Sequence, residues 1–240
     1  MAVRTAIVTG GGSGIGRAIC AQLRKDGFAV AVLDAGDVPD ASDLVLRCDV
    51  TVAPDVDDAV AQVVATFGQI DVLVNNAGIT GSRQATTLHE TPIDEWDRVH
   101  AVNVRGPFLC SRAVLPVMIR QGSGHIITIV SIAGMFAFPG RAAYSSSKGG
   151  ALMLTRSIAV DYAKHGIRAN AICPGMVYTP MTAWRLDQPD LRAAVEDPIP
   201  LGRVAQPEEI ADAVGLLASG RLGYLNGHPL VLDGGRSAYV

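Results

Sequence analysis

Clusters of residues that could hold a metal ion or a framework of disulfides are missing from this sequence. The four cysteines lie far apart and form no C-x-x-C pair, and the five histidines are scattered without the spacing of metal ligands. Metal sites and disulfide-stapled folds need such clusters. We therefore predict that the chain binds no metal and that its cysteines are buried free thiols, as in a cytoplasmic protein; they are Cys20, Cys48, Cys110 and Cys173.

An excess of charge and a long apolar run are also missing. The net charge of −3 over 240 residues argues against nucleic acid or an anionic membrane as the main partner, since both demand a basic face. The stretch 121–140 has no Asp, Glu, Lys or Arg, but glycines, serines and Pro139 interrupt it. A buried strand followed by a loop explains it better than a membrane span. The N-terminal apolar run is too short for a signal peptide and leads directly into a glycine-rich loop.

Short β-branched runs alternate along the chain with longer helical patterns. The runs predict strands at 3–9, 28–33, 44–48, 70–74, 125–130, 167–173 and 229–232, and the patterns predict helices at 14–26, 55–67, 92–120, 143–164 and 207–218. Thr91 is expected to cap the helix at 92–120, and Gly106-Pro107 to break it. We predict an α/β fold of the Rossmann type, with a doubly wound parallel sheet of about seven strands and helices on both faces. A single domain spanning 1–240 is expected from the length.

The stretch 6–19, AIVTGGGSGIGRAI, places a glycine-rich loop between a predicted strand and a predicted helix. Its glycines fit G-x-x-x-G-x-G on Gly10, Gly14 and Gly16 and do not fit G-x-G-x-x-G. Such glycines let the backbone approach a pyrophosphate, and the helix N-terminus favours an anion. The alternative is a plain glycine-rich turn. If a nucleotide binds, Ser13 and Ile15 are expected to contact it as well.

Asp34 ends the second predicted strand, eighteen positions after Gly16. A carboxylate at this place can accept hydrogen bonds from both hydroxyls of an adenosine ribose and would repel a 2′-phosphate. Ser13 and Ala35 are not basic, so Arg17 is the only nearby cation that the pattern suggests. We therefore predict NAD rather than NADP as the cofactor.

Four polar residues form a candidate catalytic group. Tyr144 and Lys148 lie four apart in a predicted helix, which places them on one face, one turn apart. Ser131 follows the strand 125–130, at the carboxyl edge of the sheet, where ligands bind in open parallel sheets. Asn103 lies inside a predicted helix, where asparagine is unfavourable and needs a reason. Each signal is weak alone.

The order and spacing of these motifs resemble the short-chain dehydrogenase/reductase family in its compact form. The resemblance covers essentially the whole chain, down to LVLDGG at 230–235. The motifs that carry it are Gly10-x-x-x-Gly14-x-Gly16, Asp49-Val50, Asn75-Asn76-Ala77-Gly78, Asn103, Ser131, Tyr144-x-x-x-Lys148 and Pro174-Gly175.

The resemblance implies a role for each catalytic residue. Tyr144 would be the general acid/base on the substrate oxygen, and Ser131 would hydrogen-bond the same oxygen. Lys148 would bind the nicotinamide ribose and lower the pKa of Tyr144, and Asn103 would hold a water that links Lys148 to solvent. A lysine charge about 5 Å away is worth roughly 3 kcal/mol at an effective dielectric constant near 20. This is enough to lower the pKa of a phenol toward neutral pH.

The resemblance also implies the remaining cofactor contacts. Besides the glycine loop, Asp34, Tyr144 and Lys148, they are Asp49 and Val50 beside the adenine, Asn76, Ala77 and Gly78 along the cofactor, Pro174 and Gly175 after the sixth strand, and Val177 and Thr179 at the nicotinamide carboxamide. By the same resemblance the chain is expected to form a homotetramer with D₂ symmetry.

The longest irregular stretch, 174–206, predicts a structureless loop that acts as a lid at about 176–206. Substrate-facing positions are expected in the lid and in the loop after Ser131. They are the apolar Met135, Phe136, Phe138, Met176, Met181, Trp184 and Leu186, with Arg141, Tyr178 and Arg185 as polar contacts. These favour an apolar ketone or secondary alcohol as the substrate.

Three functions stay open. The first is an NAD-dependent oxidoreductase that interconverts a secondary alcohol and a ketone by hydride transfer. The second is a 3-oxoacyl-(acyl-carrier-protein) reductase, which would use NADPH and which Asp34 disfavours. The third is a non-catalytic dinucleotide sensor or scaffold, which the presence of both Tyr144 and Lys148 disfavours. The acidic group at Asp55, Asp57 and Asp58 is interpreted as carboxylates at a helix N-terminus.

Overall fold

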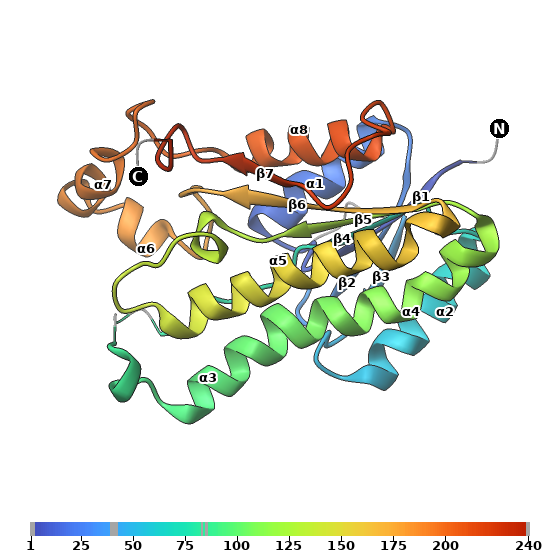
Figure 1. Ribbon diagram of the computed structural model, residues 1–240, viewed down its shortest axis with the longest axis horizontal. Coiled ribbons are helices and arrows are strands. Elements are labelled where there is room, and N and C mark those ends of the chain that lie inside the picture. Colours follow the sequence, from blue (N-terminus) through green and yellow to red (C-terminus); the bar gives the residue numbers. More distant parts are fainter. Residues whose placement is uncertain (1–2, 39–42, 83, 85, 239–240) are drawn as a thin grey trace.

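One parallel sheet organises the computed structural model, which describes residues 3–38, 43–82, 84 and 86–238. Seven strands pair in the order β3-β2-β1-β4-β5-β6-β7 (Figure 1), which confirms the predicted doubly wound sheet. In chain order they are β1 (Thr5–Thr9), β2 (Ala29–Asp34), β3 (Leu44–Arg47), β4 (Val72–Asn75), β5 (Gly124–Ile129), β6 (Ile167–Pro174) and β7 (Pro229–Leu232).

Helices cover both faces of this sheet (Figure 1). On one face lie α1 (Gly14–Lys25) and α8 (Pro207–Ala218), which pack against each other. On the other face lie α2 (Ala53–Phe67), α4 (Gly106–Gln121) and α5 (Ala142–Tyr162). The two layers of helices confirm the prediction made from the continuously apolar strands.

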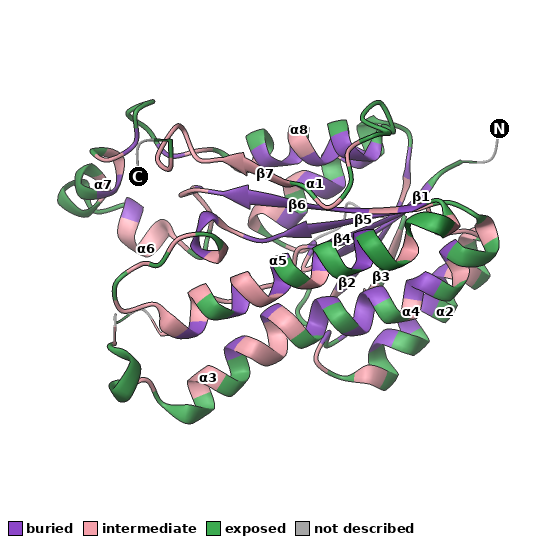
Figure 2. Ribbon diagram, in the orientation of Figure 1, coloured by how far each residue is buried: buried purple, intermediate pink, exposed green. Residues whose placement is uncertain are grey.

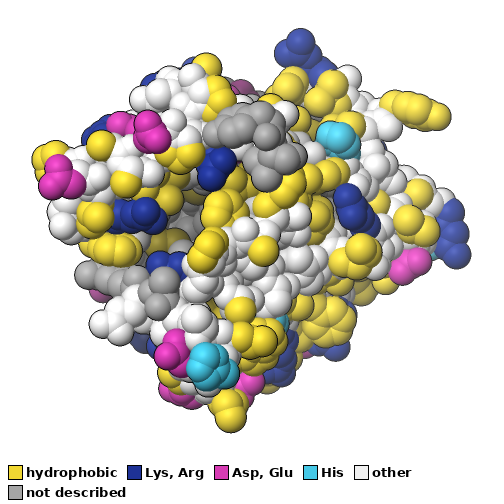
Figure 3. Space-filling model, turned by 60° about the vertical axis from the view of Figure 1, so that its left-hand side comes forward, with side chains coloured by type: hydrophobic (Ala, Val, Ile, Leu, Met, Phe, Trp, Pro, Cys, Tyr) yellow, Lys and Arg dark blue, Asp and Glu magenta, His cyan; other side chains and the backbone are white. Residues whose placement is uncertain are grey.

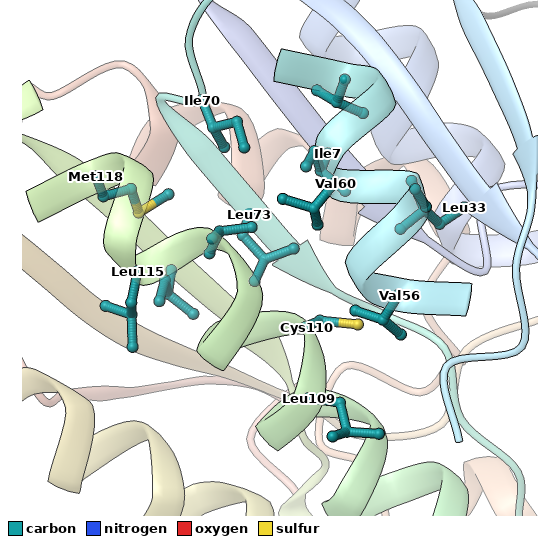
Figure 4. Close-up of a cluster of buried hydrophobic side chains, with 14 of the residues drawn as sticks. Ile7, Leu33, Val56, Val60, Ile70, Leu73, Leu109, Cys110, Leu115 and Met118 are labelled. Atoms are coloured by element: carbon teal, nitrogen blue, oxygen red, sulfur yellow. The ribbon is translucent and has the colours of Figure 1, made fainter. Parts of the chain in front are cut away.

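Two apolar cores result from this layering. Along β2, Val32 joins the core beneath α1 and α8, whereas the next residue, Leu33, joins the core beneath α2 and α4. Figure 4 shows the second core, in which Leu73 of β4 meets Val60 of α2 and Leu115 of α4. Because successive side chains of a strand point to opposite faces, every position of the central strands β1 and β4 is buried (Figure 2).

The structure differs from the predicted helix at 92–120 in two ways: the helix starts at a different residue, and its regular geometry is interrupted at a different place. It begins as α3 (Ile93–His100) with Pro92 rather than Thr91 at the N-cap, because Thr91 closes a preceding 3-10 turn. A π-helical turn (Ala101–Arg105) then joins α3 to α4. Gly106-Pro107 does not break the helix: Pro107 lies in the first turn of α4, where its missing N–H is tolerated.

The prediction that the stretch 174–206 is structureless is wrong. The stretch 174–206 contains α6 (Ala183–Leu186) and α7 (Pro189–Glu196). Leu186, Val195, Ile199 and Val204 form a small buried cluster of their own. Two short helices are therefore stabilised by apolar burial inside this segment, which lies at the left-hand end of Figure 1.

The four cysteines are buried and unbonded, which confirms the prediction of free thiols. The apolar stretch 121–140 forms the end of α4, β5 and the loop that follows, also as predicted. Among the residues with described structure, no helix has the length and apolar character that crossing a membrane requires.

Candidate active site

The site lies where the strand order of the sheet reverses. β1 pairs with β2 on one side and with β4 on the other. The chain after β1 therefore leads toward one side of the sheet and the chain after β4 toward the other, which opens a gap between the two loops. A crevice at such a point, outside the carboxyl ends of the strands, is where ligands bind in open α/β sheets. The predicted residues after β1, β4, β5 and β6 all stand at this edge.

Thr9 and Asn76 tie the loops after β1 and β4 together. The Thr9 hydroxyl oxygen accepts the backbone N–H groups of Asn76 and Ala77, each at 3.0 Å. The Asn76 amide donates to the carbonyl oxygens of Thr9 and Gly10, each at 2.9 Å. Asn76 therefore acts on the loop rather than pointing outward. This role of Thr9 was not predicted from the sequence. A polar residue at the end of an apolar strand could have indicated it.

The glycines of the loop allow the backbone to pack closely against neighbouring residues, and they also leave the backbone accessible to a ligand. A Cβ on Gly16 would collide with the Gly10 carbonyl oxygen, and a Cβ on Gly10 would lie 2.9 Å from Cα of Ala77. Gly10 and Gly14 have φ values of +65° and +50°, which glycine adopts without strain. The N-cap residue of α1, Ser13, makes no side-chain capping bond. This free helix N-terminus and the bare backbone beside it fit the pyrophosphate of a dinucleotide.

The carboxylate of Asp34 is held beside the glycine loop. Its two oxygens accept the N–H groups of Gly12 at 2.9 Å and Gly36 at 3.0 Å. Asp34 pairs in register with Arg47 of β3, so both side chains leave the same face of the sheet. Arg47 is exposed. It is a nearby cation in addition to Arg17, and the sequence prediction missed it because register between strands is not visible in the sequence.

The catalytic candidates come together around the start of α5. The Lys148 Nζ lies 5.8 Å from the ring centre of Tyr144 and donates to the Ile129 carbonyl oxygen at 2.9 Å. The side chain of Ser131 hydrogen-bonds that of Tyr144. A Cβ on Gly78 would lie 3.3 Å from both Lys148 Nζ and Asn103 Oδ1. All four predicted residues therefore surround one small region beside the loop after β4.

Asn103 lies in the π-helical turn, a feature often found at functional sites. Its Oδ1 accepts the Ile79 N–H at 2.9 Å, and its Nδ2 donates to the Ile79 carbonyl at 2.8 Å and to Ser147 Oγ at 3.0 Å. Both side-chain N–H bonds are thus used by the protein. The side chain has little capacity left for the water that the family resemblance assigns to it.

Burial dominates the electrostatics of the site. It lowers the pKa of Lys148 to about 8. Burial also raises the pKa of Tyr144, while the hydrogen bond from Ser131 acts in the opposite direction. The expected lowering of the Tyr144 pKa is therefore not found in the chain alone, because loss of solvation is the largest cause of the shift and outweighs the hydrogen bond with Ser131.

The other predicted cofactor residues are spread along the same edge. Asp49 is exposed and its Oδ1 accepts the N–H and hydroxyl of Thr51. Val50 is buried, and a Cβ on Gly106 would lie 2.9 Å from it, so its side chain belongs to the core. Pro174 ends β6, and the Gly175 N–H donates to the Leu232 carbonyl.

The segment 176–206, which the sequence predicts to be a lid, begins next to the glycine loop. A Cβ on Gly14 would lie 3.3 Å from Cβ of Thr179. Val177 is buried and pairs with Ala205, which joins the two ends of this segment. The Tyr178 hydroxyl donates to Asp187 at 2.8 Å. Thr179 is therefore close enough to the loop to meet a ligand bound there, whereas the side chain of Val177 is buried.

The acidic group at the start of α2 has structural partners. Asp55 accepts the Asp49 N–H at 3.2 Å, and Asp57 forms an ion pair with Arg112 at 3.0 Å. Within the described ranges, no three His, Cys, Asp or Glu side chains are grouped as metal ligands would be.

Comparison with known proteins gives matches along nearly the whole chain. The family profile described as Enoyl-(Acyl carrier protein) reductase matches residues 10–237. The 2-(R)-hydroxypropyl-CoM dehydrogenase of Xanthobacter autotrophicus is 51% identical over 247 residues, with 98% of this chain and 99% of that protein covered. A 3-oxoacyl-(acyl-carrier-protein) reductase of Staphylococcus epidermidis is 37% identical, with 97% and 98% covered.

A solved structure agrees in fold as well. The crystal structure of levodione reductase matches with a TM-score of 0.92 at 34% identity and covers 100% of both chains. The chain therefore belongs to the short-chain dehydrogenase/reductase family, and it is an oxidoreductase that interconverts a secondary alcohol and a ketone.

Proposed function

We propose that the chain is an NAD-dependent dehydrogenase for a secondary alcohol on a short chain that ends in an anionic group. The observation that carries the reaction is the cluster of Tyr144, Ser131 and Lys148 at the carboxyl edge of the sheet. Asp34, held beside the glycine loop, supports NAD. The four free cysteines fit a reducing compartment such as the cytoplasm.

The residues present fit a nicotinamide dinucleotide. The backbone between Gly10 and Gly16 would hold the pyrophosphate, and Asp34 would accept the ribose hydroxyls of the adenosine half. Lys148 would donate to the ribose of the nicotinamide half. When bound, the cofactor accepts or supplies the hydride.

The chain's own residues move the proton. In alcohol oxidation, the phenolate form of Tyr144 takes the hydroxyl proton, and in ketone reduction the phenol returns it to the same oxygen. Ser131, already hydrogen-bonded to Tyr144, holds that oxygen in reach. Lys148 is nearly buried and keeps its positive charge near the ring, which stabilises the phenolate.

The substrate class follows from the relative and from two arginines. Coenzyme M is 2-sulfanylethanesulfonate, so a hydroxypropyl group on its sulfur is a secondary alcohol on a chain that ends in a sulfonate. Arg141 directly precedes α5, three residues before Tyr144, and Arg185 lies in α6 of the lid. A sulfonate needs such cations. Figure 3 shows this side of the molecule, where the surface is hollowed and basic side chains lie among apolar ones.

A substrate assay tests this proposal. The (R) enantiomer of 2-(2-hydroxypropylsulfanyl)ethanesulfonate should be oxidised with NAD, with kcat/KM about 10- to 100-fold above that of the matched alcohol in which the sulfonate is replaced by hydrogen, because charge-assisted bonds contribute about 1.5–3 kcal/mol. Reduced nicotinamide absorbance measures both. Equal efficiency with the neutral alcohol would exclude recognition of the anionic end.

The alternative function is reduction of a 3-oxoacyl chain on its carrier protein with NADPH. The family profile and the relative from Staphylococcus epidermidis favour it, whereas Asp34 opposes it. Acetoacetyl thioesters with NADPH in the same assay distinguish the two. Faster turnover of the thioester than of the sulfonate alcohol would favour this alternative.

We also propose that the chain assembles as a tetramer with D₂ symmetry. Phe108 of α4 and Met153 and Val160 of α5 are 48%, 57% and 79% exposed. These apolar side chains lie on the outer surface of the helix layer, and a two-fold partner would bury them. Light scattering at micromolar concentrations should give a mass near 100 kDa, four times the 25.0 kDa of one chain. A 25 kDa particle at every concentration would contradict the assembly.

A further inference from the structure

A short segment after β4, residues 79–82, is held at both ends by one helical run. At its start, Asn103 makes two hydrogen bonds with the backbone of Ile79, at 2.8 and 2.9 Å. At its end, Glu95 Oε1 accepts the N–H of Ser82 at 3.0 Å.

The approach of the chain to Glu95 depends on glycine. Gly81 has a φ of +80°, and a Cβ on it would lie 2.6 Å from Glu95 Oε1 and 3.2 Å from Val99 Cγ2. A residue with a side chain at 81 would push the segment away from α3. The Glu95–Ser82 bond is therefore part of a close contact between the segment and α3, and it is not a chance surface contact.

Ser82 joins Glu95 to the start of the catalytic helix. While its N–H donates to Glu95, its carbonyl oxygen accepts Arg141 Nη1 at 2.6 Å. Arg141 is the N-cap residue of α5, and its own carbonyl accepts the Ser145 N–H at 2.8 Å. One N–H of the guanidinium is thus bonded to the same residue that Glu95 holds, and Tyr144 follows three residues later.

We propose that Glu95 is a positioning residue for substrate binding: through Ser82 it sets where Arg141 presents its guanidinium to the substrate. This rests on the proposed function, in which Arg141 meets the anionic end of the substrate. Glu95 itself touches neither substrate nor cofactor. Its loss should weaken binding equally in the ground state and the transition state, which raises KM and leaves kcat in place.

Steady-state kinetics with the sulfonate alcohol and NAD test the proposal. Glu95→Ala should raise KM for the alcohol about tenfold, the size expected for a lost hydrogen bond to a charged group, with kcat within about twofold and the KM for NAD unchanged. Glu95→Gln keeps an oxygen that can accept the Ser82 N–H, so it should restore most of the KM. Asp94→Ala, at the exposed neighbour on the same helix, should change neither constant and is the matched control.

A double-mutant cycle shows whether the effect passes through Arg141. If it does, Arg141→Ala should raise KM by itself, and adding Glu95→Ala should cause little further increase. Losses that multiply, a fall in kcat at unchanged KM, or a Gln variant as impaired as Ala would overturn the proposal. If Glu95→Ala does not fold, Glu95→Asp can replace it. This variant shortens the side chain by one methylene, so KM should rise in the same direction but by a smaller factor.

Hydrogen exchange tests the link without any turnover. The Ser82 amide should exchange slowly in the unmodified protein and in Glu95→Gln, and at least about tenfold faster in Glu95→Ala. Equal exchange in all three would overturn the proposal even if the substrate assay succeeds. If no sulfonate alcohol is oxidised but the exchange pattern holds, the proposed substrate is wrong while the hold of Glu95 on Ser82 stands.

Discussion

Tyr144→Phe should lose a factor of about 10²–10⁴ in kcat, the usual contribution of a general acid/base. The variant keeps the ring and its packing on α5 but removes the phenol oxygen to which we assign the proton transfer. Binding of NADH should stay within about threefold, because the phenol oxygen pairs with Ser131 and not with the glycine loop. Turnover and NADH fluorescence measure the two effects separately.

The pH dependence sharpens this test. Since burial raises the pKa of Tyr144, the phenolate is the minor form near neutrality, and alcohol oxidation should accelerate as the pH rises. The residual activity of Tyr144→Phe should lack this rise. Tyr162→Phe, at the other end of α5, is the matched control and should behave as the unmodified protein. More than about a tenth of the normal rate in Tyr144→Phe would exclude the assigned role.

Asp34 should give the unmodified protein at least a hundredfold preference for NAD over NADP in kcat/KM. A carboxylate that accepts two ribose hydroxyls contributes on the order of 2–3 kcal/mol, and each 1.4 kcal/mol is a factor of ten. The bonds from Gly12 and Gly36 hold the carboxylate in place, so it cannot turn away from a 2′-phosphate without losing both. Asp34→Ala should collapse the preference.

Two variants separate the causes of this preference. Asp34→Asn keeps an oxygen that can accept a backbone N–H but removes the charge, so it should recover NADP activity without the full loss of NAD activity. Arg47→Gln should leave NAD kinetics unchanged, because the guanidinium stands on the neighbouring strand. Comparable efficiency with both cofactors in the unmodified protein would show instead that a cation, Arg47 or Arg17, meets the phosphate.

The parts of the fold that depend on local pattern could be predicted from the sequence. Each of the seven strands lies within two residues of its predicted range, and α1 starts at Gly14 as expected. The π-helical turn could not be predicted, because one added residue in a turn leaves no distinct apolar period. α6 and α7 are too short for helical periodicity to show, and the burial of Leu186 and Val195 in a shared apolar cluster helps to stabilise them.

The candidate site divides in the same way. Tyr144 and Lys148 share a helix face, so their proximity follows from their spacing. The contacts of three other residues form only when segments distant in sequence meet in the fold; these residues are Thr9, Glu95 and Arg47. The Glu95–Ser82–Arg141 chain joins three separate elements, and strand register alone brings Arg47 beside Asp34. No local pattern encodes such contacts.

The burial of Lys148 lowers the free energy of unfolding of this protein. Burial lowers its pKa from an ordinary 10.5 to about 8, so the unfolded chain binds that proton more tightly than the folded chain does. At neutral pH both forms carry the charge, and the difference costs the fold on the order of 3 kcal/mol, which is relieved only as the pH rises from about 8 toward 10.5. Net stabilities of about 5–15 kcal/mol are usual. The burial of this one lysine therefore lowers the stability of the fold near neutral pH by a substantial part of the usual total.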